Sequence, residues 1–394
     1  MTLPPDTKAQ FSRFLDADPS RLHFAAHSHH LWPDVTFEAQ ERCWHDAAHL
    51  VDHKWEAEIF GRLYPSVQAR VARLLGLSDP GSLAFGPNTH GFLVRLLSHF
   101  PTDRPLEVLT SDGEFHSFTR QMRRLEEAGL ARVTRVPVEP FASFGKRFVE
   151  AVERVDASLV YVSQVFYDSG FAVPDLERIV AASWRPERLV VIDGYHGFMA
   201  LPTDLGAIQD RAFYLSGGYK YAMAGEGVCF LHAPPGQAPR PRDTGWFAAF
   251  ESLESSADGK VPYPASGARF LGATFDPVGL YRLEAVLAWL DKAGITVAEV
   301  HAHAHRLQAR FVAGLAKLGL DELEPSQLVV PIEEPSRGNF LTFRSERAAE
   351  LYGRLGEQGV VTDYRGDRLR FGFGFYRDEA DVDRLCEVLR RCFS

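Results

Sequence analysis

The sequence predicts an α/β protein with a mostly parallel, doubly wound sheet, followed by a smaller α+β unit at the C-terminal end. Between residues 81 and 232, short β-rich runs alternate with helical stretches. This alternation is typical of a parallel sheet that carries helices on both faces. After two long helical patterns, the last 70 or so residues return to short strand-like runs with two helices.

The elements follow one another in a clear order. Residues 35–77 show helical spacing, and Pro65 is expected to separate one helix from the next. Seven strand-like runs then occur at residues 82–86, 106–111, 131–138, 157–164, 188–193, 212–217 and 227–232. Helices are expected among them at residues 90–100, 116–129 and 174–183, and after them at residues 277–294 and 296–319.

The remaining segments are of two kinds. Residues 233–272 lack periodicity and are long enough to predict a functional loop region. The C-terminal unit is expected to contain strands at residues 327–332, 339–344, 359–366 and 368–376, with helices that begin near Glu346 and Asp378.

Composition narrows the possible functions. The chain has 394 residues, of which 45% are hydrophobic and 24% charged, as in folded proteins that bury a large core. A net charge of −9, with no Lys/Arg-rich run, argues against a nucleic-acid surface. No apolar stretch reaches the roughly 20 residues that a membrane span needs, and the start lacks the pattern of a signal peptide. We therefore expect a cytoplasmic protein, without membrane contact, that acts on a small molecule.

The cysteines give no sign of a disulfide framework or a metal site. Cys43, Cys229, Cys386 and Cys392 show no CxxC spacing. We expect free thiols in a reducing compartment.

Polar residues follow three of the predicted strands, where α/β sheets gather their ligands. The run at 188–193 ends at Asp193, with His196 three residues later. The run at 212–217 leads through two glycines to Tyr219 and Lys220, one of only seven lysines in the chain. The first run leads to a turn at the start of a helix, formed by Asn88, Thr89 and His90.

These three sets meet the needs of pyridoxal 5'-phosphate (PLP). An amine must form a Schiff base, a carboxylate must keep the pyridine nitrogen protonated, and a helix N-terminus must hold the phosphate. Taken singly, Lys220 could be a solvated lysine, Asp193 a turn former, and the turn at Asn88 an ordinary helix cap. Their joint occurrence in this order favours a PLP site.

The segment at residues 190–232 resembles the class V group of PLP enzymes, which share Asp-x-x-His followed by a Tyr/His-Lys turn. Within that group the chain is most similar to kynureninase, with support from residues 166–180, 243–254, 269–277 and 359–376. The resemblance implies the PLP-dependent transferase fold (fold type I), with a seven-stranded sheet. It also implies a division into an N-terminal segment at the active-site mouth (1–45), a large PLP-binding domain (46–290) and a small α+β domain (291–394).

The resemblance assigns roles on the cofactor side. Lys220 would form the Schiff base and later move protons, Asp193 would pair with the pyridinium, and His196 would lie at the phenolic edge. The remaining cofactor contacts would come from Asn88, Thr89, His90, Tyr167 and Tyr219, mostly at the phosphate. Trp246 and Thr274 would reach the phosphate of the neighbouring subunit, which implies a homodimer with shared active sites.

Other assignments concern the pyridine face and the substrate. His116, or alternatively Phe118, would stack on the ring. Arg370 would bind the substrate α-carboxylate through a bidentate pair. The N-terminal segment, with His27, Ser28 and His29, would enter the active-site mouth and contact the substrate. Here the chain departs from kynureninases. They carry Gly-Asn-Ser-Leu-Gly at the position of this N-terminal segment and an asparagine within the segment matching 269–277, and this chain has neither.

These features predict a kynureninase-like enzyme that hydrolyses the β,γ-bond of kynurenine or a related amino acid. A class V aminotransferase, another PLP lyase and a racemase are the alternatives. A cysteine desulfurase is disfavoured because Cys386 and Cys392 fall in the terminal helix rather than on a mobile loop. A nucleotide-binding protein would need G-x-G-x-x-G, which is absent, and a non-catalytic relative would not need Lys220, Asp193 and Arg370 together.

Two histidine clusters are given other interpretations. His23, His27, His29 and His30 lack accompanying acidic or cysteine ligands, so no metal site is predicted. The histidines from His301 to His305 are expected to form an exposed helix face.

Overall fold

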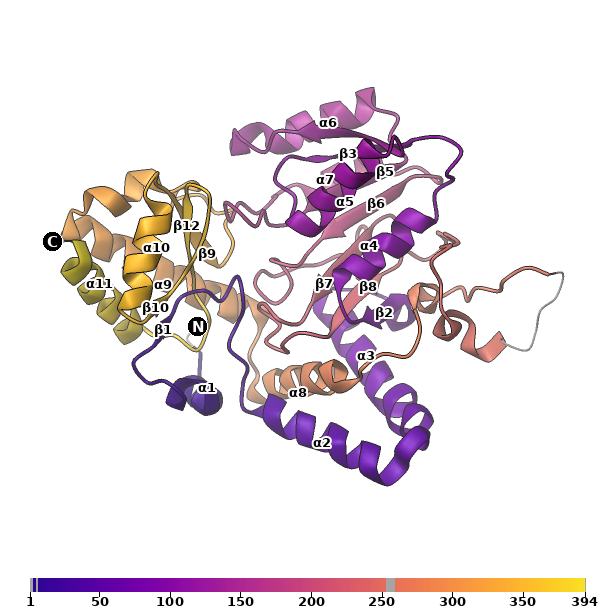
Figure 1. Ribbon diagram of the computed structural model, residues 1–394, viewed down its shortest axis with the longest axis horizontal. Coiled ribbons are helices and arrows are strands. Elements are labelled where there is room, and N and C mark those ends of the chain that lie inside the picture. Colours follow the sequence, from indigo (N-terminus) through magenta and orange to yellow (C-terminus); the bar gives the residue numbers. More distant parts are fainter. Residues whose placement is uncertain (1–2, 5, 253–258, 394) are drawn as a thin grey trace.

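The computed structural model describes residues 3–4, 6–252 and 259–393 and shows two packed units (Figure 1). The larger hydrophobic core surrounds a seven-stranded sheet and includes residues from Phe11 to Tyr376. The smaller core combines the C-terminal elements with Leu22 and Phe24 from the N-terminal segment. The predicted domain limits at residues 45 and 290 stay a prediction.

The large sheet has the predicted mostly parallel character. In spatial order its strands are β2 (Leu83–Gly86), β8 (Cys229–His232), β7 (Phe213–Gly217), β6 (Leu189–Asp193), β5 (Leu159–Ser163), β3 (Leu106–Ser111) and β4 (Ala131–Val136). The five strands from β7 to β4 run parallel, whereas β8 is antiparallel to both of its neighbours. All seven coincide with predicted runs to within a few residues.

The helices of this unit also follow the sequence pattern. They are α2 (Val35–Leu50), α3 (Tyr64–Leu74), α4 (Thr89–Ser98), α5 (His116–Glu127), α6 (Phe144–Arg154), α7 (Leu176–Ser183) and α8 (Val278–Ala293). Pro65 lies in the first turn of α3, where its missing N–H costs nothing. The stretch before it, Trp55–Leu63, is a π-helix rather than a regular continuation of α2. Helix α6 was not among the predicted elements.

The C-terminal unit contains a three-stranded antiparallel sheet of β11 (Asp363–Arg365), β12 (Arg368–Gly372) and β9 (Phe340–Arg344). Helices α9 (Val297–Leu318), α10 (Ala348–Glu357) and α11 (Glu379–Phe393) lie in the same unit (Figure 1). The N-terminal segment joins them: after the short helix α1 (Ser12–Asp16), strand β1 (Leu22–His23) pairs in parallel with β10 (Val360–Val361). The segment that follows β1 is thereby held beside β12, where Ala25 bridges to Gly372.

The predicted strand at residues 327–332 is wrong. Only Leu328 forms an isolated bridge, to Phe343. Pro331 lies within the run and Pro325 lies two residues before it. Neither has an N–H to donate to a ladder, which limits the pairing to this one point.

The prediction of an exposed histidine face on α9 is also wrong. His301, His303 and His305 are half-buried. His301 Nδ1 lies 2.8 Å from Asn339 Oδ1, His303 Nε2 lies 2.7 Å from the carbonyl oxygen of Arg377, and His305 bonds the carbonyl oxygen of Arg337. Burial lowers the pKa of all three imidazoles, so these histidines are neutral links between α9 and the loops of its own unit.

The described part of the predicted loop region at residues 233–272 lies beside the strands β2 and β8 (Figure 1), and its end packs on the sheet, where Phe270 contacts Phe213 of β7. In its described part it contains only short 3₁₀ turns at Trp246–Ser252 and Gly267–Phe270. Residues 253–258, which include part of the family-like stretch at 243–254, lie outside the described residues. Within the described chain, no helix combines the length and apolar character required to cross a bilayer.

Candidate active site

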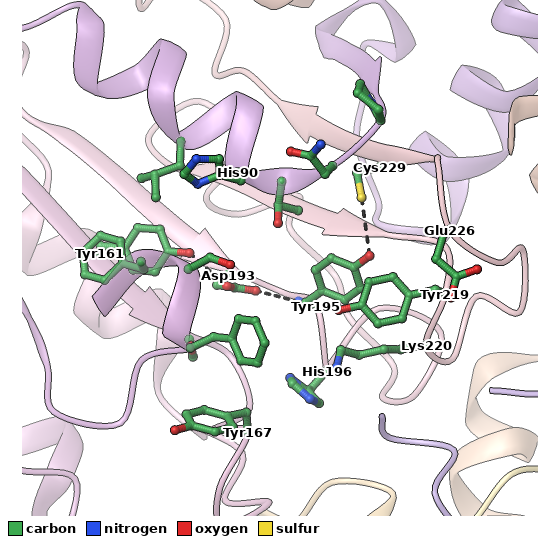
Figure 2. A pocket seen from close by; sticks show the side chains of 18 of the residues that line it. His90, Tyr161, Tyr167, Asp193, Tyr195, His196, Tyr219, Lys220, Glu226 and Cys229 are labelled. Carbon is green, nitrogen blue, oxygen red and sulfur yellow. Dashed lines mark hydrogen bonds between the residues drawn. The ribbon is translucent and has the colours of Figure 1, made fainter. Parts of the chain in front are cut away.

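A cavity of about 220 Å³ opens at the carboxyl ends of β5, β6 and β7. Figure 2 shows Asp193 and His196, from the end of β6, and Lys220, which follows β7, around this common space. Nine of the predicted site residues line it: Asn88, Thr89, His90, Phe118, Tyr167, Asp193, His196, Tyr219 and Lys220. The predicted cofactor residues that follow the strand ends therefore lie together around one cavity.

Lys220 is buried at the cavity wall and is 5% exposed. Its Nζ donates to the carbonyl oxygen of His27 at 3.1 Å and lies 5.0 Å from the ring centre of Tyr219. Burial, together with the positive charge of Arg370, lowers the pKa of Lys220 to about 7. A lysine in this state is about half unprotonated near pH 7 and can act as a nucleophile or base.

Two glycines allow the chain to deliver Lys220 here. At Gly217 an added Cβ would lie 2.3 Å from Cys229 Sγ and from the Tyr195 hydroxyl. At Gly218 it would lie 2.6 Å from Val228 Cγ1. The turn between β7 and Lys220 can therefore approach β8 only because both residues lack a side chain.

Asp193 ends β6 and presents its carboxylate to the cavity. Oδ2 accepts a hydrogen bond from the Tyr161 hydroxyl and Oδ1 accepts one from the backbone N–H of Tyr195, both at 2.9 Å. Burial raises its pKa. In the described part of the chain Asp193 has no ion-pair partner, so a cationic group in the cavity would complete its interactions.

His196 lies beside Lys220 and is 5% exposed (Figure 2). Burial and the nearby charge of Lys220 lower its pKa well below the usual value. The ring is therefore neutral, and its centre lies 5.8 Å from that of Phe340.

The N-terminus of α4 faces the same cavity and has the chemistry to hold an anion. Asn88 is the cap residue, and its side-chain oxygen accepts a hydrogen bond from the N–H of Gly91 at 2.8 Å. Because that oxygen is used within the helix, the backbone of Thr89 and His90 and the Tyr219 hydroxyl are the better donors for an anion. The residues present thus fit PLP: an amine, a carboxylate and an anion site share one cavity.

The start of α5 places its aromatic residues differently from the prediction. His116 is exposed and lines a neighbouring open hollow with Arg120 and Arg123, not the cavity. Phe118 reaches the cavity wall but is stacked on Tyr161, with ring centres 3.9 Å apart. Phe115, just before α5, also lines the cavity, and its ring centre lies 5.6 Å from Lys220 Nζ.

Arg370 lies on β12 next to the cavity and is 3% exposed. One guanidinium nitrogen pairs with Asp363 Oδ2 and another donates to the carbonyl oxygen of Tyr167. Arg368 instead lies nearer the surface and pairs with Asp168 at 3.0 Å. Of the two arginines on this face of β12, Arg370 is therefore the one beside Lys220.

The N-terminal segment reaches Lys220, although its residues do not line the cavity. His27 is fully buried, and its ring stacks on Phe340 with centres 4.7 Å apart. Neither ring nitrogen has a hydrogen-bond partner among the described residues, and Nε2 lies 3.9 Å from Asp363 Oδ2. His29 is largely exposed and stacks on Tyr219 at 5.0 Å, while Ser28 Oγ lies 3.4 Å from His29 Nδ1. Of these residues, His27 is the one enclosed beside the reactive lysine.

Trp246 and Thr274 do not line the cavity of their own subunit. Trp246 is 43% exposed, with its ring stacked on Phe247, and Thr274 is also exposed. Their predicted role at a neighbouring subunit stays a prediction. Within the described residues, no group of three or more His, Cys, Asp or Glu side chains is arranged to hold a metal ion.

Several residues at this site were not anticipated. Tyr161 and Ser163 both line the cavity from β5, and the alternation of side chains along a strand could have placed them on one face. Tyr195 Oη lies 3.4 Å from Cys229 Sγ (Figure 2). Burial raises the pKa of the Cys229 thiol to about 11, which makes it an unreactive wall residue. The four cysteines are free, as predicted.

Comparison with known proteins identifies the relatives of this chain. The family model described as aminotransferase class-V matches residues 60–385. Isopenicillin N epimerase of Streptomyces clavuligerus is 29% identical over 82% of this chain and 83% of its own. Kynureninase of Deinococcus radiodurans is also 29% identical, over 81% of this chain and 75% of its own.

Solved structures share the whole fold. A variant of C-DES with glycine covalently linked to its PLP cofactor has a TM-score of 0.82 at 17% identity and covers 99% of this chain and 100% of its own. The cysteine desulfurase CsdA of Escherichia coli has a TM-score of 0.80 at 18% identity, covering 100% and 98%.

Proposed function

The chain belongs to the aminotransferase class-V family and is a PLP-dependent enzyme, and on this basis we propose that it acts on an α-amino acid through Lys220. In our proposal Lys220 binds the cofactor covalently and then, when the substrate amine takes its place, removes the α-proton. The reaction proposed to follow is a kynureninase-like hydrolytic cleavage of the substrate side chain.

The position and charge state of Lys220 give this proposal its main support. The amine is buried, its pKa is lowered to about 7, and the cavity that it lines also contains Asp193. A neutral buried amine can accept a proton at physiological pH, as a general base at the α-carbon must. When bound, PLP supplies the electron sink that stabilises negative charge at that carbon.

The surrounding residues would hold the cofactor and keep it active. Asp193 would face the pyridine nitrogen, and the N-terminus of α4, with Thr89, His90 and Tyr219, would bind the phosphate. His196 would lie at the phenolic edge. Phe115 joins the aromatic candidates for the pyridine face, because it lines the cavity with its ring centre 5.6 Å from Lys220 Nζ, whereas His116 lines the neighbouring hollow.

The substrate would be oriented by Arg370 and the N-terminal segment. Arg370 is buried next to Lys220 and can form a charge-assisted pair with an α-carboxylate. The unpartnered ring of His27 offers a further hydrogen-bonding group beside it. Ser28 and His29 would contact parts of the substrate that extend toward the cavity mouth.

Epimerisation is the second candidate reaction. Isopenicillin N epimerase matches this chain at the same identity as kynureninase and over a slightly longer region. Both reactions begin with loss of the α-proton to a base. They differ afterwards: kynurenine cleavage consumes one water and yields alanine and anthranilate, whereas epimerisation returns a proton to the opposite face.

The test is a substrate panel in deuterium oxide with the PLP-loaded enzyme. We expect L-kynurenine to give alanine and anthranilate, detected by chromatography, and Lys220→Ala to give neither. D-amino acid formation from a peptide substrate would favour epimerisation, and sulfide or persulfide from cysteine or cystine would favour C–S cleavage. If no amino acid in the panel exchanges its α-proton for deuterium, the proposed function is wrong.

A further inference from the structure

A second acidic residue lies behind Asp193 and has no place in the chemistry described so far. Glu114 follows the end of β3 and is 3% exposed. Its Oε1 accepts hydrogen bonds from the Ser111 hydroxyl at 2.6 Å and from the Ser163 backbone N–H at 3.2 Å. Its Oε2 lies 2.5 Å from the Ser163 hydroxyl.

The surroundings of Glu114 disfavour a negative charge. Among the described residues no Lys, Arg or His side chain pairs with it, and its contacts are two hydroxyls and one N–H. The charged or titratable groups nearest to it are Asp193 and Tyr161, neither of which is a cation. Burial, with a contribution from Asp193, raises the pKa of Glu114 to about 8. A buried carboxylate without a cation is costly, whereas a neutral acid here can donate to Ser163.

Ser163 connects Glu114 to the cofactor cavity. It is the last residue of β5, it pairs with Asp193 across the sheet, and it lines the cavity. Two residues earlier on the same face of β5, Tyr161 donates to Asp193. If the acid proton of Glu114 points to Ser163 Oγ, the Ser163 hydroxyl hydrogen is free to point toward the cavity.

We propose that Glu114 is a positioning residue of the cofactor site, which as a neutral acid fixes Ser163 and leaves Asp193 as the sole negative charge at that end of the cavity. The effect of Glu114 on the cofactor rests on the proposed function. The charge state of Glu114, however, is a property of the protein alone and is testable without PLP.

The first experiment measures thermal unfolding of the cofactor-free protein and of Glu114→Gln from pH 5 to pH 9. A carboxyl whose pKa is raised by folding stabilises the protein below its unfolded pKa, and that stability is lost as pH rises through the folded value. We therefore expect the wild-type melting temperature to fall relative to Glu114→Gln between about pH 5 and pH 8. The exposed Glu127→Gln is the matched control and should show no such trend. The proposal would be overturned if the melting temperature of the wild type rises relative to that of Glu114→Gln as pH increases, or if the difference between the two melting temperatures stays constant.

The second experiment measures PLP affinity and the pH profile of cofactor absorbance. Glu114→Ala and Ser163→Ala should each weaken PLP binding by about tenfold and shift the pH midpoint of the cofactor absorbance. The double variant should bind PLP as well as either single variant, because both changes remove the same Glu114–Ser163 hydrogen bond. Glu114→Gln should recover most of the loss, since an amide can still donate to Ser163. Additive losses, or a Glu114→Gln as poor as Glu114→Ala, would contradict the proposal. If the wild type takes up no PLP, the proposed function fails, while the unfolding experiment still decides the charge of Glu114.

Discussion

At the scale of single residues, the reactivity of Lys220 follows from its burial. Its pKa is lowered to about 7 because the charged form loses hydration and faces Arg370, although Asp193 and Asp363 oppose the shift. Lysines at the surface of the same chain have no such surroundings. This environment makes Lys220, one lysine of seven, the candidate for covalent chemistry.

This environment predicts how cofactor uptake depends on pH. Only the neutral amine attacks an aldehyde, so the rate of PLP incorporation into cofactor-free enzyme should rise from pH 6 to pH 8 with a midpoint near pH 7. Stopped-flow absorbance would measure it. A midpoint close to 10 would mean that Lys220 has the pKa of a solvated lysine.

Arg370 and Arg368 make a matched pair for testing substrate binding. A lysine cannot reproduce the forked geometry of guanidinium, so Arg370→Lys should raise KM by about tenfold or more while the cofactor spectrum is unchanged. Arg368→Lys, whose side chain pairs with Asp168 and Glu139 instead, should have little effect. The reverse pattern would place the substrate carboxylate at Arg368.

The sequence allowed Lys220 and Asp193 to be predicted because each follows a strongly apolar strand, where ligands collect. It did not reveal Glu114 or Phe115. Both lie in the turn between β3 and α5, where no periodicity fixes the direction of a side chain. The choice between His116 and Phe118 rested on family resemblance and did not consider Phe115.

At the scale of elements, the first turn of α5 decides which aromatic ring faces the cofactor. Phe115 is the residue before the helix and turns into the cavity, whereas His116 points to the exposed hollow. Phe115→Ala should shift the cofactor absorbance maximum and weaken PLP binding by about tenfold, since an aromatic stack is lost. His116→Ala should leave both unchanged. A large spectral change in His116→Ala alone would return the stacking role to His116.

Elements with strong periodicity were predicted well, and those shaped by distant contacts were not. Helix α9 has a capping box at Thr296 and Glu299 and a left-handed glycine, Gly319, after its last residue, so its ends could be recognised. Its histidines were misjudged because their partners, Asn339 and the backbone of Arg337 and Arg377, come from segments more than 30 residues away. The run at residues 327–332 was wrongly predicted as a strand for a similar reason. Its apolar residues favour burial, but strand formation also requires pairing with a distant segment, and here only Leu328 forms a bridge.

At the scale of the whole molecule, the active site depends on segments from both hydrophobic cores. The large sheet supplies Asp193 and leads to Lys220, β12 supplies Arg370, and the N-terminal segment places the carbonyl oxygen of His27 beside Lys220 Nζ. The pattern of strands and helices predicted the two units, and family resemblance predicted that the N-terminal segment enters the active-site mouth. Periodicity alone could not have shown that β1 pairs with β10, because each strand has only two residues.

A homodimer with shared sites predicts complementation between inactive subunits. Trp246 and Thr274 lie outside their own cavity, so each should serve the neighbouring one. Lys220→Ala and Thr274→Ala subunits should each be inactive or strongly impaired alone, yet a mixed dimer should contain one intact site and regain activity. Co-expression with two affinity tags would isolate the mixed species. No recovery in that species, or a fully active monomer in sedimentation, would contradict shared sites.

The most direct test of the account is to identify the residue that holds the cofactor. The purified enzyme, incubated with PLP, should absorb between about 390 and 430 nm, and borohydride should reduce the link to a stable adduct. Peptide mapping by mass spectrometry should then find the pyridoxyl group on Lys220 and on no other of the seven lysines. A label on a different lysine, or a protein that takes up no cofactor, would contradict the assignment of Lys220 as the reactive amine.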